Sequence, residues 1–82
     1  MNIQSLQSLM LNDSGFAFHP ETGESFQLSE TGAATIRLIL AGTDEKDLPE
    51  KIAEEFDVDA TVADRDIEGF LLTLKQLKLI AI

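Results

Sequence analysis

The sequence contains no cysteine, no tryptophan and no tyrosine, and it has only one histidine. Without cysteine, neither disulfides nor thiolate metal sites can stabilise the fold. The single histidine, His19, lies beside Pro20 in a stretch typical of a turn, whereas nucleophilic catalysis requires a nucleophile, a base and a group that orients the base. We therefore expect a solvated His19, no catalytic residue and no cofactor.

Positive charge is also scarce, with 6 lysines and arginines against 15 aspartates and glutamates in 82 residues. The resulting net charge of −9 repels phosphate backbones and anionic lipid surfaces, which argues against nucleic-acid and membrane partners. No apolar run approaches the roughly 18–20 residues that span a bilayer, and the N-terminus lacks the pattern of a signal peptide. We expect a cytoplasmic protein.

Carboxylates gather in two short runs, DEKD at 44–47 and DVD at 57–59. Neither run has the spacing and central glycine of an EF-hand calcium loop. Both runs precede predicted helices, where acidic side chains are stabilised by the positive end of the helix dipole. We therefore expect helix caps here rather than a metal site.

The first third of the chain predicts three short strands. Residues 6–11 are apolar enough for a strand, and a polar turn follows them. Phe16 and Phe18 share one face of a second strand, residues 19–24 form a hairpin loop, and residues 25–28 form the third strand.

Helical periodicity then predicts three helices. The first helix begins after Ser29 as N-cap and extends to about residue 41. The second begins near Asp47, which has the spacing of a capping box with Glu50. The third extends from about residue 62 to residue 78, and residues 79–82 follow it as an apolar tail.

Strands followed by helices indicate an α+β fold: a three-stranded antiparallel meander followed by three helices, in one domain over residues 1–82. The last two helices resemble a helix-turn-helix pair, so a nucleic-acid-binding regulator is one alternative, and a winged-helix-like scaffold is another. However, Asp64, Asp66 and Glu68 crowd the start of the third helix, where a DNA-reading helix needs cations and amides.

The third predicted strand has neither lysine nor proline, the residues that commonly protect a sheet edge. An unprotected edge beside an apolar helix suits strand addition, in which main-chain hydrogen bonds give affinity and side-chain pockets give selectivity. The sequence therefore favours binding of a protein or peptide over catalysis.

Several runs along the chain match a known family in order and spacing: LSETGAA at 28–34, IRLI at 36–39, IAEEFDVD at 52–59 and the final helical stretch 66–77. Together they resemble the PqqD-like family, whose members are also called RiPP recognition elements. The hairpin at 15–26 is similar to that of a stand-alone subgroup that usually carries aspartate where His19 stands. The resemblance covers nearly the whole chain after about residue 8.

The resemblance implies a winged helix-turn-helix-like fold and a non-catalytic chaperone role of the kind found in coenzyme PQQ biosynthesis. Such domains bind the leader segment of a ribosomally made precursor peptide and deliver it to a modifying enzyme, such as a radical-SAM protein. The leader adds as a further strand to the third strand and lies in the groove beside the third helix. Carried over to this chain, the peptide-binding residues would be Ser25, Phe26, Gln27, Leu28, Arg65, Asp66, Ile67, Phe70, Leu71 and Leu74.

Overall fold

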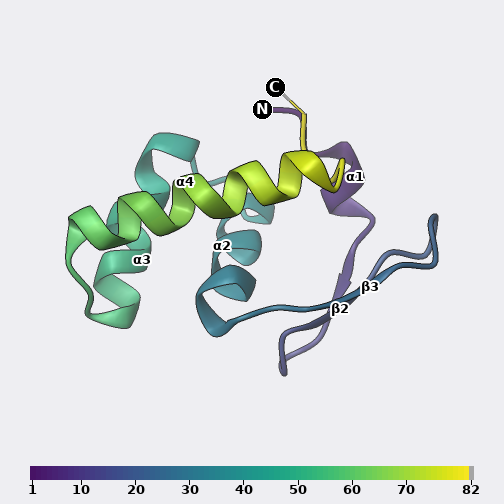
Figure 1. The fold of residues 1–82 in the computed structure, drawn as a ribbon, viewed down its shortest axis with the longest axis horizontal. Helices are drawn as coiled ribbons and strands as arrows, with labels where there is room; N and C mark the ends of the chain where they lie inside the picture. Colours follow the sequence, from purple (N-terminus) through teal and green to yellow (C-terminus); the bar gives the residue numbers. More distant parts are fainter. Residues whose placement is uncertain (82) are drawn as a thin grey trace.

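The computed structural model describes residues 1–81 of the chain. Three antiparallel strands form one sheet ahead of the long helices, which confirms the predicted α+β fold. In Figure 1 the sheet lies at one end and α3 at the other, with α2 between them and the long α4 extending across α2 and α3. The elements in chain order are α1 (Gln4–Gln7), β1 (Met10–Leu11), β2 (Phe16–Phe18), β3 (Ser25–Gln27), α2 (Glu30–Leu40), the 3₁₀ turn η1 (Glu45–Asp47), α3 (Leu48–Phe56) and α4 (Ala60–Gln76).

The N-terminal segment differs from its prediction. A strand over residues 6–11 is wrong for most of that range, because the chain forms the short helix α1 and only the last two residues enter the sheet. The physical reason is spacing. Leu6 and Leu9 are both buried, and side chains three residues apart share a helical face rather than a strand face.

Caps begin α2 and α4 as the sequence predicts. The Ser29 hydroxyl accepts a hydrogen bond from a first-turn backbone N–H of α2 at 3.1 Å, and Asp59 does the same for α4 at 2.8 Å. At α3 the predicted capping box is wrong, since Asp47 makes no side-chain capping bond. The chain first forms η1, and Asp44 caps that turn instead.

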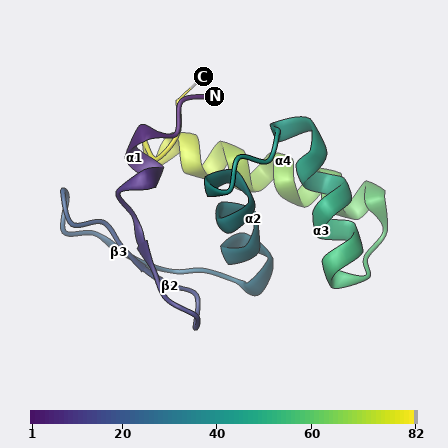
Figure 2. The same ribbon diagram turned by 180° about the vertical axis from the view of Figure 1, so that it is seen from behind.

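The apolar C-terminal segment packs onto the fold instead of trailing from it. Lys78 adopts a φ of +61°, and the backbone N–H of Leu79 donates to a carbonyl in the last turn of α4 at 2.9 Å. This reversal buries Leu79 and Ile80 and allows Ala81 to pair with Asn2 in an antiparallel bridge. The two ends of the described chain therefore meet near α1, as the reverse view in Figure 2 also shows. Residue 82 of the predicted tail lies outside the described residues.

The inner and outer faces of the sheet follow from its register. Phe16 and Phe18 share a face, as alternation predicts, but that face is the outer one: they are 44% and 38% exposed, whereas Ala17 is fully buried. Ala17 pairs directly with Phe26, so these two side chains point to the same side of the sheet. Phe26 packs against the core, and the outer face keeps two exposed phenylalanines beside the exposed Met10.

Helices, β2 and both chain ends contribute to one apolar core. The α3–α4 pair, predicted as a helix-turn-helix-like unit, packs with α2 around it. No helix within residues 1–81 combines the length and apolar character needed to cross a membrane. The core residues are Leu6, Leu9, Ala17, Ala34, Ile36, Ile39, Leu48, Ile52, Ala63, Ile67, Leu71, Leu74, Leu79 and Ile80.

Candidate functional site

The outer edge of β3 is the first part of the candidate site. The strand order β1-β2-β3 leaves β3 paired on one side only. The backbone N–H of His19 donates to the Glu24 carbonyl at 2.8 Å, and that of Leu28 donates to the Gly15 carbonyl at 2.8 Å. Hydrogen-bonded and non-hydrogen-bonded pairs alternate along an antiparallel ladder. Glu24, Phe26 and Leu28 therefore direct their backbone groups toward β2.

Ser25 and Gln27 alternate with these inward-bonding residues and therefore direct their backbone groups away from the sheet. Each offers one N–H and one C=O along the edge. Both are exposed. Phe26 and Leu28 have the opposite role: their backbone faces β2 and their half-buried side chains pack against the core. The predicted docking strand 25–28 thus divides into two residues that present the edge and two that anchor it.

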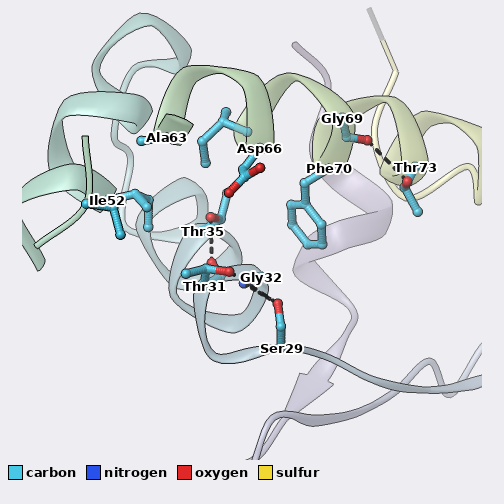
Figure 3. A pocket seen from close by; sticks show the side chains of 12 residues that line it. Ser29, Thr31, Gly32, Thr35, Ile52, Ala63, Asp66, Gly69, Phe70 and Thr73 are labelled. Carbon is cyan, nitrogen blue, oxygen red and sulfur yellow. Dashed lines mark hydrogen bonds between the residues drawn. The ribbon is translucent and has the colours of Figure 1, made fainter. Parts of the chain in front are cut away.

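A groove between α2 and α4 is the second part of the site. It has a volume of about 330 Å³, and Ser29, where β3 leads into α2, is one of its lining residues. Figure 3 shows Phe70 reaching from α4 toward the start of α2. The lining residues are Ser29, Thr31, Gly32 and Thr35 of the α2 side, Ile52 and Val58 of the α3 side, and Ala63, Asp66, Ile67, Gly69, Phe70 and Thr73 of α4.

Phe70 and Gly32 fix the width of the groove. A Cβ atom added to Gly32 would lie 3.1 Å from one ring carbon of Phe70 and 3.3 Å from another. The ring therefore rests on the backbone of α2 at the one position there without a side chain. Phe70 is half-buried, and its ring both lines the groove and packs against the core.

The predicted residues of α4 divide between the groove and the core. Asp66, Ile67 and Phe70 line the groove. Leu71 and Leu74 are 6% and 1% exposed and belong to the core beneath it. Arg65 is exposed on α4 and is not among the lining residues.

The α2 wall is the part of the site that the sequence did not indicate. Two threonines of α2, Thr31 and Thr35, line it together with Ser29, and their hydroxyls are already engaged. Thr35 donates to the Thr31 carbonyl at 2.7 Å, and the hydroxyls of Thr31 and Ser29 form a hydrogen bond at 3.3 Å. The one available signal was Gly32, because a glycine inside a helical pattern often marks a close approach of another element.

The prediction of a solvated His19 is wrong. Its side chain is only 4% exposed, and within residues 1–81 its Nδ1 atom has no hydrogen-bond partner. The reason is again the register, since His19 is two residues beyond Ala17 and so points to the same, inner face. The turn begins one residue later than the sequence suggested.

A three-stranded sheet with an open edge, followed by a packed helix pair, defines a small winged helix-turn-helix-like domain. The chain matches the family described as Coenzyme PQQ synthesis protein D (PqqD) over residues 14–80. It belongs to the PqqD family, which confirms the resemblance seen in the sequence. No curated protein and no solved structure matches the chain. At the level of the family, membership supports a non-catalytic, peptide-binding accessory role of the PQQ-biosynthesis type.

Proposed function

We propose that this chain binds the leader segment of a ribosomally made precursor peptide and presents it to a modifying enzyme, such as a radical-SAM protein. The leader adds as a fourth strand along β3 and places side chains in the groove between α2 and α4. The protein acts as a chaperone in the cytoplasm, where such precursors are made, and contributes no catalytic group.

The observation that carries the proposal is the direction of the β3 backbone. Ser25 and Gln27 offer outward N–H and C=O groups a few residues before Ser29, which lines the groove. A strand that bonds to both residues gains up to four main-chain hydrogen bonds, each contributing about 0.5–1.5 kcal/mol net. Every second side chain of a bound strand points to the same face of the sheet. A peptide that is paired with β3 can therefore also place side chains in the groove.

The other predicted residues take supporting roles in this proposal. Ile67 and Phe70 provide apolar contact in the groove, and Asp66 provides its charge. Leu71 and Leu74 hold α4 in place from the core. Arg65 lies outside the groove and is available to the part of the leader that extends beyond it.

A proline scan of the edge tests strand addition. Gln27→Pro removes one outward N–H and places a ring against the incoming strand, yet proline is tolerated on edge strands. Gln27→Ala is the matched control, because it removes only the side chain, whose Nε2 donates to the Ser14 carbonyl at 3.1 Å. The measurement is an amide-shift titration with a synthetic leader of the cognate precursor peptide.

We expect the alanine variant to bind like the parent and the proline variant to bind about threefold to tenfold more weakly, the equivalent of one lost hydrogen bond. Ser25→Pro is expected to behave in the same way. Circular dichroism establishes that each variant is folded. Folded proline variants that bind as tightly as Gln27→Ala would show that the leader does not add to this edge.

A further inference from the structure

The end of the groove nearest α3 combines an apolar floor with a single carboxylate. Asp66 is the one charged residue among the twelve described residues that line the groove. In Figure 3, Asp66 and Phe70 both point from α4 toward α2, as expected for side chains four residues apart on a helix. Ile67 and Ala63 form the buried floor beside them.

No cation of the described chain neutralises this carboxylate. Positions 62, 63, 69 and 70, its neighbours on the helix surface, are all uncharged. Within residues 1–81 the Asp66 carboxylate makes neither an ion pair nor a hydrogen bond with another side chain. The groove therefore presents an acceptor that a bound ligand can use.

The surrounding charge has the same sign. Residues 44–68 carry eleven carboxylates and three cationic side chains, which gives −8 of the total net charge of −9. This segment comprises η1, α3 and the first half of α4, and both α3 and α4 contribute residues to the lining of the groove. Residues 69–82, by contrast, carry no carboxylate and two lysines. A cation is thus attracted to the α3 end of the groove in particular.

We infer that the groove binds a lysine or arginine side chain of the peptide, with its aliphatic stem on Ile67 and Phe70 and its charged head at Asp66. Long basic side chains bury their stems along apolar surface while the head stays polar. A cation near the Phe70 ring also gains from the negative face of its π-system. The inference rests on the proposed function, because it describes the peptide that adds to β3.

The positive end of the α2 dipole does not oppose this placement. That end lies at Ser29, and its effect falls off within the first helical turn. Thr35, which lines the wall nearer Asp66, is in the second turn of α2. The two ends of the groove therefore differ: the end at Ser29 suits a carbonyl of the peptide, and the α3 end suits a cation.

A designed peptide series tests the inference without knowledge of the natural leader. The probe is an acetylated and amidated seven-residue strand-forming peptide of alternating threonine and valine, with its central residue replaced by arginine, citrulline, lysine, norleucine or glutamate. Citrulline keeps the shape of arginine without its charge, and norleucine keeps the stem of lysine. Binding is followed by amide shifts of the full chain at low salt, and the amides of Ser25 and Gln27 report on strand addition.

We expect the arginine and lysine peptides to bind about fivefold more tightly than their neutral counterparts, which converts to about 1 kcal/mol. Asp66→Asn should abolish this preference. Asp64→Asn is the matched control, because it removes the same charge from the same helix at an exposed position outside the groove, and it should preserve the preference.

The outcomes separate this inference from the proposed function. Loss of the preference to the same extent in both variants would overturn the inference, since only the general field of the protein would then matter. Equal binding of all peptides with shifts at Ser25 and Gln27 would overturn it too, but would support strand addition. An Asp66-dependent preference without shifts at those two amides would support the basic-side-chain site and contradict strand addition. Absence of any binding at millimolar peptide concentrations would overturn the inference that the groove binds a basic side chain.

Discussion

Gly15 and Gly23 provide a matched pair of substitutions at the two ends of the β2–β3 hairpin. Both adopt a positive φ, +83° and +78°, so alanine at either position incurs the cost of the left-handed region, about 1–2 kcal/mol. Their surroundings differ. A Cβ atom at Gly15 would lie 2.8 Å from the Leu28 carbonyl oxygen, whereas nothing lies within 4 Å of one at Gly23.

The extra cost at Gly15 comes from the backbone that connects the edge strand to α2. Relieving the contact requires Leu28 to move away, which weakens the 2.8 Å hydrogen bond from its N–H to the Gly15 carbonyl. Loss of that bond together with residual strain adds about 1–2 kcal/mol. We therefore expect Gly23→Ala to cost about 1–2 kcal/mol and Gly15→Ala about 2–4 kcal/mol.

Urea denaturation followed by circular dichroism measures both costs. The whole domain is expected to have a free energy of unfolding of about 4–12 kcal/mol from its length, so the difference between the variants is readily measured. It corresponds to a melting temperature of Gly15→Ala that is about 4–16 °C below that of Gly23→Ala. Equal destabilisation by the two substitutions would refute the close packing of Gly15 against Leu28 and, with it, the position of the end of β3.

Four further predictions follow from burial and charge. Leu6→Ala should cost about 2–5 kcal/mol in urea denaturation, because Leu6 is fully buried although it lies in a four-residue helix near the chain end; a cost below about 1 kcal/mol would mean that α1 does not pack. His19→Leu should be neutral or stabilise the fold by about 1 kcal/mol, since it removes a buried nitrogen without a partner; a clear loss of stability would indicate a role for the imidazole. Phe70→Ala should cost about 1–3 kcal/mol, less than for a fully buried phenylalanine, because part of its ring faces the groove; a larger loss would place the ring in the core. A gel-shift assay with random duplex DNA at physiological salt should detect no binding, because a net charge of −9 provides no release of counterions, and a micromolar shift would contradict this.

The long helices were predictable because their signals are local. Ser29 and Asp59 act through hydrogen bonds to the next few residues, and the apolar spacing within α2 and α4 is contained in each segment. The face of β2 was not predictable in the same way. Alternation establishes that Ala17 faces away from Phe16 and Phe18, but it does not establish which side meets the helices. That choice depends on Phe26 and the helices that cover it, which are distant in sequence, and the burial of His19 follows from the same choice.

The candidate site was predictable to a similar extent. The β3 edge and the α4 wall came from the family resemblance, together with the absence of protecting residues on the third strand. The α2 wall did not, because the contact between the Phe70 ring and Gly32 forms only after the two helices have packed against each other. For the same reason, the apolar stripe of the last helix did not distinguish Leu71 in the core from Phe70 at the groove.

The sheet has two edges, and its hydrogen-bond pattern explains why β3 is the one suited to a peptide. The Asn12 N–H donates to the Phe16 carbonyl at 3.0 Å, so by the same alternation Leu11 is the one residue of the two-residue β1 that directs its backbone outward. A single outward residue allows at most two main-chain bonds. Ser25 and Gln27 double that number, and the chain continues from them directly to Ser29, which lines the groove. A peptide that pairs with β3 therefore gains main-chain bonds and a side-chain pocket along one line, which β1 does not offer.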